Sequence, residues 1–288
     1  MIRALFSLLL VAFAAPLTAQ IPLKIYAQDL VDRAVAANPD LLVIVMHVTP
    51  PKAAENIIIA SNIGRIGKPG DEDDIRVIET GKANLEVAAN GERFEVELPL
   101  LDVNGATIGA LGLVWPYRAG QDKATFAAKA DRIRDGLAKR TLNAANLMEP
   151  YLLDPRATTR TRAQKLVDAA AARHAEFRLL AIRGQSKTLG GFVLLGSTFG
   201  RHGKKAVAEQ VAVFQRGEPA GVVHANIKRY SVDVPLLDRA GRKAGLMTVS
   251  YPWKSANDEK ALMAKALALR DELRAQIASA EQLEELDP

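Results

Sequence analysis

Two stretches of the sequence combine hydroxyl, amide and cationic side chains with closely spaced glycines. They read SNIGRIGK at residues 61–68 and STFGRHGK at residues 197–204. Glycine lets backbone N–H groups approach a carboxylate or phosphate that nearby cations attract, although the Gly-x4-Gly-Lys-Ser/Thr spacing of a Walker A loop is missing. The alternative is a structural strand-to-helix connection whose glycines adopt positive φ. The candidate ligand-binding residues are Ser61, Asn62, Arg65, Lys68, Ser197, Thr198, Arg201 and Lys204.

Four acidic residues, Asp71 to Asp74, follow the first stretch after Pro69 and Gly70. A metal site is one interpretation, but acids that open a helix more simply cap it and complement its dipole. The matching segment of the second copy reads VAEQ, with one acid instead of four. No Ser/His/Asp set and no carboxylate pair recurs in both parts of the chain, and the absence of cysteine excludes thiolate chemistry. We therefore predict no catalytic residue, no metal site and no cofactor.

Both stretches belong to a repeat that covers most of the chain. Shifting the sequence by 136 residues, which moves position 47 to position 183, aligns two copies without a gap. The shift places PLLD at 99–102 on PLLD at 235–238, and Gly105 on Gly241. One offset maintained over this length indicates a duplication. We predict one domain over residues 20–157 and a second over residues 158–288.

Each copy has the periodicity of a helix, two strands, a short helix, a three-stranded meander and a long helix. Within the meander, apolar residues alternate with Glu95 and Glu97, which is typical of a half-solvated antiparallel strand. The order predicts an α+β fold of two tandem PAS-like domains, each a five-stranded antiparallel sheet flanked by helices. The predicted helices cover 22–38, 71–80 and 122–148 in the first copy and 159–174, 207–216 and 257–286 in the second.

Three further side chains are candidates for the same site. His47 aligns with Arg183, so the two copies could present a donor from the same position. Trp115 and Tyr117 end the last strand of the first copy, where aromatic rings could stack on a ligand. The alternatives are a buried structural histidine and aromatic residues that seat the following helix.

The hairpin sequence of each copy resembles a known family. FEVELPLLDVNGATIGALGL at 94–113 and VPLLDRAGRKAGLM at 234–247 resemble the closing hairpin of Cache domains, the extracytoplasmic relatives of the PAS fold. IETGK at 78–82 is similar to the segment that precedes the third Cache strand. The resemblance covers about 100 residues of each copy and implies a PAS-like fold that senses small molecules between its sheet and loops.

The first nineteen residues have the pattern of a cleavable signal peptide. Arg3 is followed by an apolar run from Ala4 to Ala15, and Pro16 and the small Ala19 mark a cleavage site. The run is shorter than the ~20 residues that span a bilayer. The formal charge of +5 is scattered among nearly as many acids, which disfavours a nucleic-acid binder.

Together these patterns predict a periplasmic, non-catalytic protein that binds or senses a small, anionic metabolite. One alternative is an interaction module that docks onto an envelope receptor or transporter without a ligand pocket. The other is a metal-dependent hydrolase that uses the acids of the 71–74 run.

Overall fold

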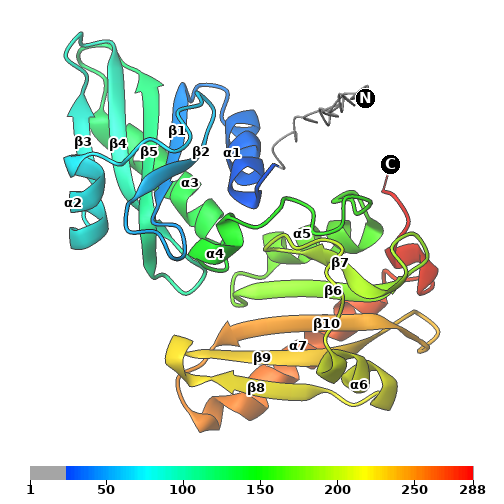
Figure 1. The fold of residues 1–288 in the computed structure, drawn as a ribbon. Helices are drawn as coiled ribbons and strands as arrows, with labels where there is room; N and C mark the ends of the chain where they lie inside the picture. Colours follow the sequence, from blue (N-terminus) through cyan, green and yellow to red (C-terminus); the bar gives the residue numbers. More distant parts are fainter. Residues whose placement is uncertain (1–23, 288) are drawn as a thin grey trace, which may run out of the picture.

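The computed structural model describes residues 24–287 and shows the same sheet built twice (Figure 1). The predicted signal peptide at 1–19 lies outside the described residues. Within the described part of the chain, every helix is too short or too polar to cross a membrane.

The first domain contains five strands, with helices before, within and after them. Its helices are α1 (Tyr26–Ala37), α2 (Glu72–Thr80), α3 (Lys123–Ala138) and α4 (Ala144–Leu147), and its strands are β1 (Val43–Val48), β2 (Ile57–Ser61), β3 (Asn84–Val87), β4 (Arg93–Leu101) and β5 (Thr107–Pro116).

The second domain repeats this order. Its helices are α5 (Arg162–Arg173), α6 (Ala208–Arg216) and α7 (Glu259–Arg274), with short 3-10 turns η1 (Ala225–Ile227), η2 (Ala256–Asp258) and η3 (Glu281–Leu283). Its strands are β6 (Leu179–Ser186), β7 (Gly191–Ser197), β8 (Ala220–His224), β9 (Arg229–Leu237) and β10 (Lys243–Pro252).

The two sheets have the same topology and register. The strand order is β2-β1-β5-β4-β3 in one and β7-β6-β10-β9-β8 in the other, and all neighbours are antiparallel. A bulge precedes His47 where β1 pairs with β2, and another precedes Arg183 where β6 pairs with β7. The predicted fold class is confirmed, and the bulges show that the duplication extends to local irregularities.

The first sheet has one apolar face and one mixed face. Phe94, Val96 and Leu98 of β4 are buried in the core formed with α1 and α3. The alternate residues face the other side, where α2 and the loop after β2 cover the sheet (Figure 1). Because side chains alternate along a strand, this second face carries both glutamates of β4.

Both predicted long helices are wrong in extent. α3 ends because the hydroxyl of Thr141 donates to the carbonyl oxygen of Leu137, and the Thr141 carbonyl oxygen accepts from the Val103 N–H. In the second copy α7 stops at Arg274, and Ile277 returns into the core. Tertiary contacts therefore end helices that an apolar pattern alone would continue.

The first domain docks on the mixed face of the second. Val103 and Leu142 pack against a cluster from β6, β7 and the following loop: Leu179, Ala181, Leu194 and Phe199. Both guanidinium donors Nε and Nη2 of Arg201 lie 2.7 Å from carboxylate oxygens of Glu149, next to α4. The glycine-containing loop of the second copy is thus part of the contact between the domains.

Candidate functional site

A cavity of about 340 Å³ lies against the mixed face of the first sheet, beneath α2 and the loop after β2. Apolar side chains form part of its wall, and charged side chains form the rest. The walls comprise Val43, Val45 and His47 of β1, Ile58 of β2, Ile63, Arg65, Lys68 and Pro69 of the loop, Asp71 and Asp74 at α2, Ala88 just after β3, Arg93, Glu95 and Glu97 along β4, and Gly112 and Val114 of β5.

Arg65 and Lys68 lie where the sequence predicted them, at the exposed rim of this cavity. Gly64 and Gly67 adopt positive φ, as does Arg65 at 65°, and the Lys68 N–H donates to the Arg65 carbonyl oxygen. No ion pair within residues 24–287 involves either cation. Both are available to an anionic group.

His47 lines the inner part of the cavity together with Asp74. The His47 Nδ1 lies 3.3 Å from Asp74 Oδ2, and both side chains are almost fully buried. Burial lowers the pKa of His47 and raises the pKa of Asp74 from their ordinary values. The charged form of each is therefore disfavoured.

Glu97 was missed by the sequence analysis. It is 8% exposed, so the prediction that this side of β4 is solvated is wrong at this position, because α2 and its loop cover it. Its Oε2 accepts from Asn84 Nδ2 at 3.2 Å, and burial raises its pKa to about 7. The alternation of apolar residues with glutamate correctly predicted the face of the sheet on which Glu97 lies. It did not predict that α2 and the loop after β2 cover this face.

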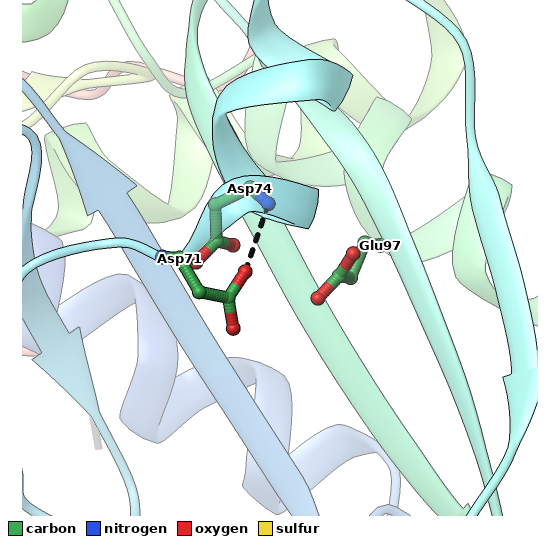
Figure 2. A group of neighbouring side chains, drawn as sticks. All are labelled: Asp71, Asp74 and Glu97. Atoms are coloured by element: carbon green, nitrogen blue, oxygen red, sulfur yellow. Dashed lines mark hydrogen bonds between the residues drawn. The ribbon is translucent and has the colours of Figure 1, made fainter.

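The acids before α2 cap the helix, as predicted. Asp71 Oδ1 accepts from the N–H groups of Asp73 and Asp74, and Asp74 Oδ2 accepts from the Asp71 N–H. Figure 2 shows these carboxylates at the start of α2 with Glu97 opposite them on β4. Ligand atoms of Asp71, Asp74 and Glu97 all lie within 4.8 Å of one another.

Ser61 and Asn62 do not line the cavity but complete the edge of the sheet. Ser61 Oγ accepts from the Ile63 N–H, and its backbone pairs with the Gln28 side chain. Asn62 Oδ1 accepts from the Ile44 N–H, and its Nδ2 donates to Leu42 O. The two residues thus have structural contacts where the sequence suggested ligand contacts.

Trp115 and Tyr117 lie with the apolar core on the other face of the sheet. Trp115 is buried, and both rings contact Phe126 of α3. They seat the helix, which was the alternative interpretation, and do not border the cavity.

The matching residues of the second copy are engaged within the protein. Ser197 Oγ donates to the Gly200 carbonyl oxygen, Thr198 Oγ1 accepts from the Leu180 N–H, and Arg201 binds Glu149. Lys204 is exposed. At the position of His47, the Arg183 Nη1 donates to Thr248 Oγ1, whose hydroxyl donates to Asp233.

A larger groove of about 530 Å³ runs between α1 and α3. Its floor is apolar and its edges carry cations, but it contains none of the residues that the sequence singled out. The smaller cavity is the better candidate because it joins charged groups from four elements at one place.

No family model and no curated protein sequence matches the chain. Among solved structures, PelD from Pseudomonas aeruginosa is 16% identical, with 90% of this chain and 79% of that one covered at a TM-score of 0.29. A second PelD structure, in complex with c-di-GMP, is 17% identical, with 89% and 78% covered and a TM-score of 0.28. The inducer-binding domain of the Acinetobacter transcription factor PobR, in complex with 3-hydroxybenzoic acid, is 12% identical. The match covers 39% of this chain and 95% of that one at a TM-score of 0.27.

These scores carry no inference about a ligand of this chain. The resemblance to Cache domains remains a prediction, since none of the comparisons concerns that family.

Proposed function

We propose that the protein is an exported, non-catalytic binding or sensing protein, and that its first domain holds a small polar ligand with an anionic group. The cavity beside Arg65 supports this proposal most directly. Its rim presents two cations without ion-pair partners in the described chain, and guanidinium and ammonium groups in this setting attract carboxylate or phosphate.

The second copy supports a division of roles between the domains. The same face that forms the cavity in the first copy is covered in the second by Val103 and Leu142. Arg201, which aligns with Arg65, is held by Glu149. We infer that only the first copy binds ligand, and that the second anchors it.

A thermal-shift screen of the purified protein against carboxylates, amino acids and phosphates tests the proposal. A ligand at 100 times its dissociation constant stabilises the folded state by about 2.7 kcal/mol. We expect a saturable rise in melting temperature that Arg65→Ala and Lys68→Ala reduce. Lys204→Ala, the matched change in the second copy, should leave the shift intact. The absence of any shift at millimolar ligand, or equal shifts in all variants, would contradict the proposal.

Export is tested separately. The predicted outcome is that the mature protein is recovered from the periplasmic fraction with a new N-terminus near residue 20. Recovery with the intact N-terminal sequence in the cytoplasm would oppose this part of the proposal.

A further inference from the structure

The three carboxylates at the inner end of the cavity each keep one oxygen free of hydrogen bonds within residues 24–287. Asp71 uses Oδ1 and Asp74 uses Oδ2 in the helix cap, while Glu97 uses Oε2 to accept from Asn84. The helix cap and the bond from Asn84 together therefore account for only half of the six carboxylate oxygens. The free oxygens of these carboxylates remain accessible from the cavity that the three residues line, so a cation that enters the cavity can reach them.

An unpartnered amide lies beside these carboxylates. Asn56 is 8% exposed, and neither its Oδ1 nor its Nδ2 has a hydrogen-bond partner among the residues that the structure describes. A Cβ added at Gly70 would come within 2.8 Å of Asn56 Oδ1 and within 3.3 Å of Asp74 Oδ2, so both oxygens converge beside this glycine. The amide is therefore buried next to Asp74 without a partner, and a bound ion is one of the partners that such a group takes.

In the second copy, a positively charged side chain of the protein itself lies near the acid at the matching position. There Asp233 takes the place of Glu97, and the guanidinium of Arg183 reaches it through Thr248. The position of Asn56 holds Phe192, whose ring stacks on Phe214 at 4.8 Å. The first copy has His47 in place of the arginine, and no arginine or lysine of the described chain pairs with its three acids.

We propose that this end of the cavity binds one Ca²⁺ ion between Asp71, Asp74 and Glu97, with the amide oxygen of Asn56 as a fourth ligand. Carboxylate and amide oxygens are the ligands that Ca²⁺ prefers. Ca–O distances of about 2.3–2.6 Å place oxygens on opposite sides of the ion roughly 4.6–5.2 Å apart. Ligand atoms within 4.8 Å of one another are compatible with this spacing, and Ca²⁺, unlike Mg²⁺, accepts the irregular geometry of a site built from protein oxygens alone.

Isothermal titration of the EDTA-treated, dialysed protein with CaCl₂ tests the proposal without any organic ligand. We expect one site per chain and a rise in melting temperature on addition of calcium. Glu97→Gln and Asp74→Asn should each weaken binding at least tenfold. Asp73→Asn is the matched control, because Asp73 belongs to the same acidic run but pairs with Arg76 at the surface, and it should change binding less than twofold.

Glu97→Gln gives a second readout that a merely structural carboxylate would not give. Without calcium the variant should melt above the wild type at neutral and higher pH, because it lacks a buried charge. With calcium it should melt below the wild type. Should Asp74→Asn disturb the helix cap, Glu97→Gln alone still decides, since it lies on β4.

The proposal fails if 10 mM CaCl₂ produces neither heat nor a melting shift, if Glu97→Gln binds like the wild type, or if only Zn²⁺ or Mg²⁺ binds. The rim substitutions Arg65→Ala and Lys68→Ala should leave calcium binding in place. A failure of the calcium site is thereby distinct from a failure of organic ligand binding.

Discussion

The two copies share one fold but use the same face of the sheet differently. Val43, Val45, Ile58 and Ile63 line the cavity of the first copy. The four matching positions in the second copy, Leu179, Ala181, Leu194 and Phe199, form the cluster that contacts Val103 and Leu142. In the first copy this face borders a cavity that also has polar walls, whereas in the second copy the same face is covered by residues of the first domain.

The two copies show that a duplicated sheet can keep its topology while one of its faces changes from the wall of a cavity to a contact between domains. Position 47 is a histidine whose Nδ1 lies 3.3 Å from Asp74 Oδ2, and position 183 is an arginine that donates to Thr248. Position 66 is an exposed isoleucine, and position 202 is a buried histidine. The change at position 202 fits a surface that has become interior, whereas His47 and Arg183 are equally buried and differ in their partners.

The largest effect is expected for Val103→Asp. The carboxylate would enter the apolar cluster that joins the domains, so we expect the free energy of unfolding to fall by about 4 kcal/mol. Denaturant unfolding measures the loss. Arg239→Asp, at the matched and exposed position of the second copy, should be nearly neutral. Similar losses for both variants would mean that the covered face contributes little.

Arg183→Met comes next. It would leave the half-buried Asp233 and Thr248 without the guanidinium at the other end of their hydrogen-bonded chain, and loss of a partner in a hydrogen-bonded network with charged groups typically costs about 3 kcal/mol. His47→Met should cost less than about 1.5 kcal/mol, because burial already disfavours the charged histidine. Chemical denaturation of both variants at pH 7 measures the two losses in unfolding free energy. Equal losses would contradict the proposed difference between the copies.

The docked loop of the second copy predicts a dependence on pH. Burial lowers the pKa of His202 to about 4, and its Nε2 donates to Gln164 Oε1. Below about pH 6.5 the unfolded chain binds a proton that the folded chain binds only near pH 4. The free energy of unfolding should therefore decrease as pH falls through this window, by up to about 3 kcal/mol.

The measurement is the difference in unfolding free energy between the wild type and His202→Gln from pH 7.5 to 4. The variant removes the titrating group, and effects of other groups cancel in the difference. A difference that stays constant across this range would show that His202 is not held neutral.

The smallest effect concerns the helix after each loop. Val207 stands at the N-cap of α6 without a side-chain cap, whereas Asp71 caps α2. Val207→Asp should therefore stabilise the protein by about 1 kcal/mol, because the new carboxylate can accept from the first-turn N–H groups. Thermal unfolding measures this gain, and a loss would indicate that the local backbone of α6 cannot form the cap.

Much of the architecture could be predicted from the sequence. The offset between the copies, the order of strands and helices and the helix over 71–80 follow from periodicity, and the structure has a duplicated fold with a helix at this place. The rim cations were predicted for a physical reason as well, since glycine-flanked cations suit anions.

The interior of the candidate site was less accessible to such reasoning. Glu97 looks solvated in the sequence because strand alternation gives the face of a side chain but not what covers it. No sequence pattern around Asn56 indicates a role in the site, because its role depends on Gly70 and Asp74, which lie beside it only in the folded chain. Trp115 was predicted at the correct end of its strand. The sequence did not show whether its side chain lies on the face of the sheet that packs in the core or on the face that borders the cavity.

The covered face of the second copy has a consequence for how the chain is made. Translation delivers the N-terminal part first, and domains tend to fold as they emerge. Val103 and Leu142 are therefore synthesised before Leu179, Leu194 and Phe199, the apolar residues they shield. A chain started downstream of the first domain would expose these three to water and to other chains, so the order of the two copies along the gene protects the nascent protein from aggregation.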